Sequence, residues 1–171
     1  MDNHAPEGTE RRNRQSEAYD LYGARLYGYL MTVVRSSQAA EDILQEIFCK
    51  LAARGRWFAP EDPERYLFRA AHNEARRWLR NARRAHAALA DAEPVAAPSD
   101  VGEEERRDEA LKSALATLPP EQAEVVHLKI HENMTFAQIG ALVGCPANTA
   151  ASRYRYACEK LRDLLGGLAD E

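Results

Sequence analysis

Apolar residues in the first half of the chain recur at steps of three and four, which is the spacing of one face of an α-helix. The first such run covers residues 17–35. Its apolar positions are Tyr19, Tyr22, Leu26, Leu30 and Val33. A second run, at about 38–53, follows two serines that can cap it, and a third runs from Pro63 to about Ala85 with Asp62 as a typical N-cap. We therefore predict three helices in this half.

The helical spacing returns near Asp108 and is broken by two prolines after Leu118. A further helix is expected at about 121–132, and the stretch from Met134 to Leu161 carries the signals of two helices joined by a tight turn. Alternation of the kind that marks strands does not stand out. The predicted fold class is therefore all-α.

The start of the first of these two helices is marked by Thr135 and Gln138, a capping box that satisfies free N–H groups at a helix start. Met134 and Ile139 occupy the two positions of a hydrophobic staple around that cap. Together the four residues predict a helix start at this point.

The turn that follows is marked by glycine, proline and asparagine. Gly140 is small where two helices must cross closely, and Gly144 suits a turn that needs a positive φ. Pro146 prevents the first helix from continuing, and Asn148 is a good N-cap for the second. This order predicts a helix-turn-helix, a motif typical of DNA binding.

The segment between the two halves is rich in alanine, proline and acidic residues, which predicts a linker with little structure. We expect two small all-α domains, at residues 16–86 and 108–166, joined by a flexible acidic linker at 87–107. The second domain would hold a winged-helix-like helix-turn-helix. The polar residues 1–15 are expected to be disordered.

The charge of the chain is segregated along its length. A net charge of −4 argues against a protein that simply coats DNA. Residues 64–86, however, carry seven Arg and two Glu, a net of +5, whereas residues 87–110 carry eight acids and two Arg, a net of −6. Such blocks indicate one surface for a polyanion and another segment that is kept away from it.

The arginines of the third predicted helix gather on one side, within a sector of roughly 60°. They are Arg65, Arg69, Arg76, Arg80 and Arg83. Apolar residues such as Leu67, Ala71 and Trp78 fall on the opposite side. Because arginine suits planar phosphate recognition and almost no acid interrupts this face, nucleic-acid contact is favoured over a merely solvated face.

The second predicted helix carries acid on its polar side, at Glu41, Asp42, Gln45 and Glu46, with Lys50 the only base nearby. Asp42 and Glu46 are like charges at i,i+4 spacing, which costs an isolated helix about 0.2–0.5 kcal/mol, so folding gains nothing from them. A basic or hydrogen-bonding partner surface would explain this face. A solvated face is an equal alternative.

The second helix of the helix-turn-helix has a polar side that begins at its N-terminal end. This side carries Asn148, Ser152, Arg155 and Tyr156, with Thr149 and Arg153 on its flank. Asn and Arg at this end can pair with adenine and guanine in the major groove. Helix pairs in ordinary proteins look somewhat similar, but the complete set of signals favours DNA. Trp57 and Phe58, in the loop before Asp62, could stack on an unpaired base or plug a small core.

Membrane, metal and catalytic classes are disfavoured. The chain has no apolar run of about 18 residues and no secretory signal at its start. Its three cysteines are widely spaced, which fits reduced cytosolic thiols. His127 and His131 have the spacing of zinc ligands but lack a third ligand, so a surface pair is favoured. We expect a cytoplasmic protein that is not an enzyme and has no cofactor or metal.

The order of these pieces over residues 17–165 resembles the extracytoplasmic-function (ECF) sigma factors of bacterial RNA polymerase. Residues 40–48 (AEDILQEIF) resemble the family's polymerase-binding helix, and residues 66–73 (YLFRAAHN) with the arginines that follow resemble its −10 promoter helix. Residues 118–122 (LPPEQ) and the segment through Arg153 resemble its −35 recognition domain. Each motif is moderately specific alone, and three in order around an acidic linker are strong.

The resemblance implies a subunit that binds core RNA polymerase and directs promoter recognition and transcription initiation. The core-polymerase contacts would be Glu41, Asp42, Gln45 and Glu46. The −10 DNA contacts would be Trp57, Arg69, Asn73, Arg76, Arg77 and Arg80. The −35 DNA contacts would be Asn148, Thr149, Ser152, Arg153 and Arg155. The linker would thread toward the RNA exit path, and an anti-sigma factor is a further expected partner.

Three positions depart from the family's pattern. Arg77 stands where the family often has Asp, Ala123 replaces a frequent Arg, and Ala151 stands where Lys is common. The two alanines remove positive charge from the −35 domain, which bears on its affinity and preferred sequence. The alternatives are a two-domain DNA-binding regulator that does not recruit polymerase and, less favoured because of the arginine face, a protein-binding adaptor.

Overall fold

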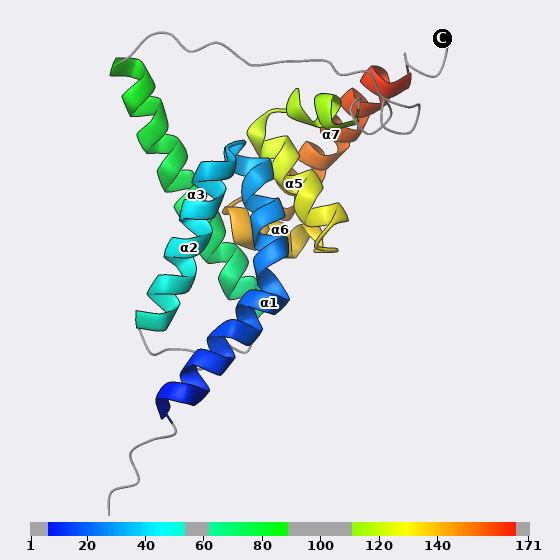
Figure 1. Cartoon of the computed structure of the whole chain (residues 1–171). Coiled ribbons are helices and arrows are strands. Elements are labelled where there is room, and N and C mark those ends of the chain that lie inside the picture. The colour runs from blue at the N-terminus through cyan, green and yellow to red at the C-terminus, as the bar shows by residue number, and fades with distance from the viewer. Residues whose placement is uncertain (1–6, 54–61, 89–110, 167–171) are drawn as a thin grey trace, which may run out of the picture. The chain divides into compact units, whose positions relative to one another are not determined.

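The computed structural model describes residues 7–53, 62–88 and 111–166 (Figure 1). Within these ranges every regular element is a helix and no strand occurs, which confirms the all-α class. The helix-turn-helix of the described part therefore has no wing, and that part of the expectation is wrong. By its internal contacts the chain divides into two compact units, Met1–Asn81 and Ala82–Glu171, which are described separately below.

Helix α1 spans Glu7–Val34 and starts much earlier than the pattern of apolar residues predicted. The expectation that residues 1–15 are disordered is therefore wrong from Glu7 onward. Residues 7–15 contain Glu, Arg and Gln, which are good helix formers, and no proline interrupts them. Hydrophobic periodicity finds only the part of a helix that packs on a core, so it overlooked this polar extension.

Helix α2 spans Ser37–Ala53 and helix α3 spans Pro63–Ala88, and both start where the sequence predicted. The Ser36 hydroxyl accepts a hydrogen bond from the Ala39 N–H at 3.3 Å. The Asp62 carboxylate accepts one from the Arg65 N–H at 2.9 Å. Each cap satisfies an N–H that the first helical turn leaves without a partner.

The core of the first unit is made by the apolar sides of all three helices. Its fully or nearly fully buried members include Leu26, Tyr29, Leu30, Ile43, Ile47, Leu67 and Phe68. The rings of Tyr29 and Phe68 meet edge to face with centroids 5.5 Å apart, which joins α1 to α3. Those of Tyr19 and Phe48 meet in the same way at 5.0 Å, which joins α1 to α2. The polar sides of α2 and α3 are thereby left facing away from the core.

The second unit contains a short helix at residues 111–116, then α5 (Pro120–Ile130), α6 (Phe136–Val143) and α7 (Ala147–Gly166). A buried cluster joins the segment before α5 to α5 and α7. Its members are Leu118, Ala123, Val126 and Ala157, with Leu115, Tyr154 and Leu161 packed against them. This cluster holds α7 in place from the side opposite to its polar face.

The helix-turn-helix has the start and the turn that were predicted. The Thr135 hydroxyl and the Gln138 side chain form both bonds of the capping box, at 3.2 and 2.8 Å. Gly144 ends α6 with φ of 76°. A Cβ atom on Gly140 would lie 2.5 Å from the carbonyl oxygen of Cys145, so glycine is required there by the backbone of the turn itself.

One detail of the turn differs from the prediction. Asn148 is not the N-cap of α7, because the helix starts at Ala147 and the carbonyl of Pro146 already accepts the N–H groups of Thr149 and Ala150, at 2.9 and 3.1 Å. Because the carbonyl of Pro146 is the acceptor at the helix start, α7 begins one residue before Asn148. Asn148 instead lies in the first turn of α7 and is exposed.

Candidate functional site

The polar side of α2, here called the acidic face, consists of Glu41, Asp42, Gln45 and Glu46, all of which are exposed. The opposite side of the same helix is buried, with Ala40, Ile43, Leu44 and Ile47 between 0% and 6% exposed. The apolar side thus accounts for how α2 is held in the fold. The acidic face is left available for a partner.

Glu46 is the member of the acidic face that already has a partner. Its Oε1 atom lies 2.7 Å from Lys50 Nζ, one helical turn onward. The hydrogen bond from Lys50 holds the pKa of Glu46 below its usual range, against a smaller opposing effect of burial. The prediction that folding gains nothing from these charges is therefore too strict, because a Glu-to-Lys pair at this spacing offsets the repulsion between Asp42 and Glu46.

The arginine side of α3, here called the arginine face, is exposed as predicted at Arg65, Arg69, Arg76, Arg80 and Arg83. On the other side Leu67, Phe68 and Ala71 are almost fully buried. The two sides of α3 therefore differ in their surroundings. One side packs on α1 and α2, and the other presents guanidinium groups to solvent.

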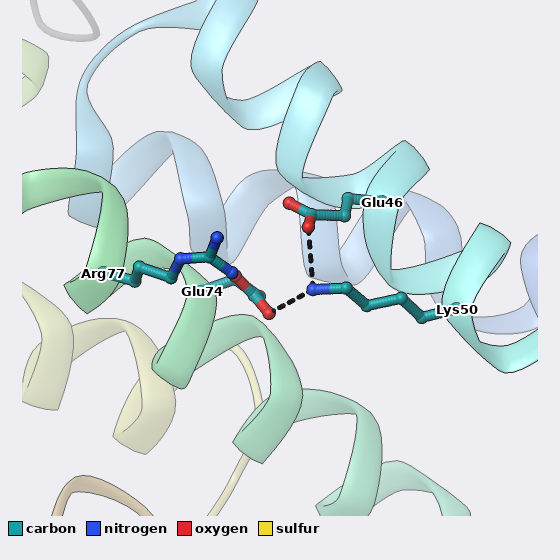
Figure 2. A network of polar contacts seen from close by, with 4 residues as sticks. All are labelled: Glu46, Lys50, Glu74 and Arg77. Atoms are coloured by element: carbon teal, nitrogen blue, oxygen red, sulfur yellow. Dashed lines mark hydrogen bonds and ion pairs between the residues drawn. The ribbon is translucent and has the colours of Figure 1, made fainter. Parts of the chain in front are cut away.

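Four charged side chains connect the acidic face of α2 to Arg77, an exposed arginine of α3 that lies beside the arginine face (Figure 2). Lys50 Nζ lies 2.7 Å from Oε1 of Glu46 and 2.7 Å from Oε1 of Glu74, a residue of α3. The other oxygen of Glu74 lies 3.3 Å from Nη1 of Arg77. The hydrogen bonds to Glu46 and Glu74 raise the pKa of Lys50. We refer to these four residues as the charge network.

Two members of the charge network have a role that sequence reasoning missed. In the sequence, Glu74 is one of two acidic residues among the seven arginines of residues 64–86. Its i,i+3 spacing to Arg77 was the only local feature that indicated an ion pair. Its bond to Lys50 joins residues 24 apart in the sequence, which no helical periodicity can reveal.

A cavity of about 320 Å³ is lined in part by Lys50 and Glu74 of the charge network. Arg69 and Asn73, both expected to contact DNA, line it together with Tyr66, whose ring was also missed. Apolar walls come from Ile47 and Leu51 of α2. The volume is at the lower end of the range of roughly 300–1,000 Å³ typical of small-ligand pockets. Trp57, the aromatic residue expected here, lies outside the described residues.

The polar side of α7 is divided between exposed and half-buried residues. Asn148 and Arg155 are exposed, whereas Thr149, Ser152 and Arg153 are half-buried. Arg153 Nη1 lies 4.0 Å from Cys145 Sγ, so this side chain turns back toward the turn. The guanidinium of Arg155 stacks 5.1 Å from the ring centroid of Tyr156.

Ala123 contributes to the packing of the second unit, a role that the sequence analysis did not predict. It is 4% exposed and belongs to the buried cluster of this unit. Ala151, the other position of the two, is half-exposed on α7.

Among the described residues, no group of three His, Cys, Asp or Glu side chains is placed to hold a metal ion. His127 is not part of a surface pair as predicted, since its side chain is only 11% exposed. Burial, with a smaller contribution from His131, lowers its pKa to about 4. Among the helices of the described ranges, none combines the length and the apolar character that crossing a membrane requires.

Comparison with known proteins identifies both units. The family model "Sigma-70 region 2" matches residues 18–85, and "Sigma-70, region 4" matches residues 114–163. The RNA polymerase sigma factor CarQ of Myxococcus xanthus is 38% identical over 157 residues, which cover 89% of each chain. The ECF RNA polymerase sigma factor SigK of Mycobacterium tuberculosis is 27% identical over 161 residues, which cover 88% of this chain and 84% of SigK.

Two solved structures share the fold at lower identity. The sigma factor RpoE of Bartonella quintana, solved with the anti-sigma factor NepR, matches with a TM-score of 0.69 and 23% identity over 88% of this chain and 96% of RpoE. CnrH, solved with the cytosolic domain of CnrY, matches with a TM-score of 0.59 and 22% identity over 90% of this chain and 88% of CnrH. At this identity the likeness shows the fold alone.

Proposed function

The chain belongs to the ECF sigma factors of RNA polymerase, and from this premise we propose how its three polar surfaces divide the work. As a sigma factor it binds core RNA polymerase and directs promoter recognition and transcription initiation. The observation that carries this conclusion is the presence of both sigma regions, in order, in a chain that matches a curated sigma factor along 89% of its length.

The acidic face of α2 is the proposed contact for core polymerase. Glu41, Asp42 and Gln45 are exposed on a helix whose other side is fully committed to the core. The exposed carboxylates of Glu41 and Asp42 suit a basic partner surface, because opposite charges across an interface speed association and fix its orientation. Within the acidic face, Asp42 is the residue whose charge reversal should matter most, since Glu46 also has Lys50 as a partner.

The arginine face of α3 is the proposed contact for the −10 promoter element. Arg76 and Arg80 of this face, together with the neighbouring Arg77, would neutralise phosphates, which gives affinity without sequence readout. Arg69 and Asn73 line the same cavity as Tyr66, so a base could meet hydrogen-bonding groups and an aromatic ring there. Trp57 belongs to this proposed site by sequence.

The start of α7 is the proposed contact for the −35 element. Asn148 is exposed in the first turn and its side chain is not needed as a cap, which leaves its amide available to a base edge. Thr149, Ser152, Arg153 and Arg155 complete the proposed surface. Because the proposed surface carries two cations, Arg153 and Arg155, the −35 contact should depend on polymerase to hold it on the promoter.

The remaining assignments complete the proposal. The domains are residues 16–86 and 108–166, with the acidic linker at 87–107 reducing DNA binding by the free chain through competition for the basic faces. The chain acts in the cytoplasm and has no catalytic activity of its own. An anti-sigma factor is proposed as a partner because RpoE, a sigma factor of similar fold, was solved in complex with the anti-sigma factor NepR.

Run-off transcription with purified core enzyme and a promoter library tests the proposed function. We expect transcripts that start at a defined set of promoters only when both core enzyme and this chain are present. A chain that binds DNA tightly and specifically by itself, and yields no transcripts with core enzyme, would instead be a regulator that does not recruit polymerase.

A further inference from the structure

The charge network joins Glu46 of the acidic face, which the proposed function assigns to polymerase, to Arg77, which it assigns to the −10 DNA (Figure 2). We propose that Lys50 and Glu74 couple these two binding events. A partner that binds Glu46 weakens the ion pair between Glu74 and Arg77, which makes Arg77 available to DNA. DNA that binds Arg77 in turn weakens the ion pair between Lys50 and Glu46, which makes Glu46 available to polymerase. This inference rests on the proposed function of both faces. It assigns Lys50 and Glu74 as positioning residues that act through Glu46 and Arg77.

The geometry of the network supplies the first support, because each inner residue is shared between two partners. Lys50 Nζ is equally distant, at 2.7 Å, from a carboxylate oxygen of Glu46 and one of Glu74. Glu74 uses one oxygen for Lys50 and the other for Arg77. A change at either end therefore alters the charge available to the next pair.

The exposure of the four side chains supplies the second support. Glu46 and Arg77 are 46% and 59% exposed, so both ends are accessible to macromolecular partners. Lys50 is 41% exposed, nearly as much as Glu46, whereas Glu74 is only 20% exposed. The ends can therefore exchange partners while Glu74 stays largely within the protein.

The coupling follows from competition between ion pairs. A cation of the polymerase that binds Glu46 replaces Lys50 there, and the ammonium of Lys50 then serves Glu74 alone. With its charge better neutralised, Glu74 holds Arg77 less strongly. A phosphate that takes Arg77 has the reverse effect, and linkage requires the two effects to be equal in size.

The two ends also interact weakly through space. The pKa of Glu46 is lowered chiefly by the hydrogen bond from Lys50, and the positive charge of Arg77 makes the smallest contribution in the same direction. Because exposed ion pairs are individually weak, we expect the coupling to change affinity by about two- to fivefold.

The test uses the full-length chain without polymerase and measures anisotropy of a labelled −10 single-stranded oligonucleotide at low ionic strength. Glu46→Gln removes one negative charge from the acidic face, and Asp42→Asn and Glu41→Gln remove the same charge from neighbouring exposed positions. We expect Glu46→Gln to tighten DNA binding by about twofold more than either control. Equal effects of the three substitutions would overturn the proposal.

Two further backgrounds show whether the effect travels through the network. In Arg77→Gln and in Lys50→Gln, Glu46→Gln should change DNA affinity no more than Asp42→Asn does. An undiminished advantage of Glu46→Gln in either background would mean that the effect is long-range charge alone, and would contradict the coupling. Thermal unfolding of each variant, all at surface positions, checks that the fold is kept.

A failure of the coupling is distinguishable from a failure of the proposed function. If Arg80→Gln weakens oligonucleotide binding while the Glu46 and Arg77 substitutions act independently, the arginine face binds DNA and the coupling is wrong. If no arginine of α3 affects binding, the assignment of that face to DNA is wrong, and the coupling falls with it.

Discussion

The helix-turn-helix and the α2–α3 region differ in the sequence distance across which their defining contacts form. In the helix-turn-helix, Thr135 bonds Gln138 three residues away, and Gly140 meets the carbonyl of Cys145 five residues away. In the first unit, Lys50 bonds Glu74 across 24 residues and Arg25 bonds Glu64 across 39. The first kind of region is built from local backbone rules, and the second from pairings that exist only once the helices have packed.

The difference teaches that the two regions should fail in different ways. Substitutions in the helix-turn-helix should affect stability, because backbone geometry is fixed there by single residues. Substitutions on the exposed sides of α2 and α3 should affect binding while the fold is kept, because the buried sides hold the helices. The following substitutions test that contrast.

The largest effect is expected for Gly140→Ala. The added Cβ would meet a backbone oxygen at 2.5 Å, and backbone cannot move aside as a flexible side chain can. We expect a loss of about 3 kcal/mol in the free energy of unfolding of the second unit, measured by chemical denaturation.

Two other glycines provide matched controls for Gly140. Gly144→Ala should cost only about 1 kcal/mol, since nothing lies within 4 Å of its Cβ position and only the positive φ opposes the change. Gly23→Ala, inside α1 and in ordinary contact with the ring of Tyr19, should stabilise by about 0.5–1 kcal/mol. Three equal values would show that the turn does not impose the predicted constraint.

The next effect concerns the acidic face. Asp42→Lys should weaken association with core polymerase by about thirtyfold or more, because it places a like charge against a basic partner surface. Surface plasmon resonance with immobilised core enzyme measures this. Asp163→Lys, an equal charge reversal at an exposed position of α7, should leave the affinity nearly unchanged.

The third prediction uses the buried side chain of His127. Its pKa is lowered from 6.5 to about 4, so the unfolded chain binds more protons between these values and the second unit loses stability as pH falls through this window. The carboxylate of Glu132, 3.6 Å away, favours the protonated form and reduces the loss. We therefore expect a decrease of about 1–2 kcal/mol from pH 6.5 to 4.

Denaturation at several pH values, with His127→Gln beside wild type, measures the contribution of this residue. The substitution should remove part of the dependence on pH in this window. His131→Gln, at an exposed neighbour, should retain most of it. An unchanged dependence in His127→Gln would show that this histidine titrates normally in the folded protein.

The smallest of these effects is expected on the arginine face. Arg80→Gln should weaken promoter binding by the holoenzyme by about fivefold and lower the slope of log affinity against log salt by about one. Arg162→Gln on α7, exposed and outside the proposed sites, is the control. A loss restricted to particular promoter sequences would instead indicate that Arg80 reads a base.

The sequence predicted those parts of the fold that depend on local rules. The caps at Asp62 and Thr135 and the left-handed Gly144 are each confirmed, since each depends on a few neighbouring residues. The faces of α2 and α3 were also predicted, because helical periodicity separates buried from exposed positions.

The rest needed the packed structure. The early start of α1 was not predicted because its first turns carry no apolar pattern. Asn148 was predicted as the N-cap of α7, but the carbonyl of Pro146 is the acceptor at that helix start. The burial of Ala123 and the bond between Lys50 and Glu74 depend on which helices pack against each other. The spacing of residues along one helix does not predict this. The roles proposed for the exposed residues depend on partners and stay predictions.

The central claim is that α2 and α3 present separate surfaces to polymerase and to promoter DNA. It is tested most directly by run-off transcription titrated with increasing concentrations of the chain, at limiting promoter DNA. Asp42→Lys should shift the midpoint to higher concentration and reach the wild-type plateau, whereas Arg80→Gln should keep the midpoint and lower the plateau. The same shift in both variants, or none in either, would contradict the account.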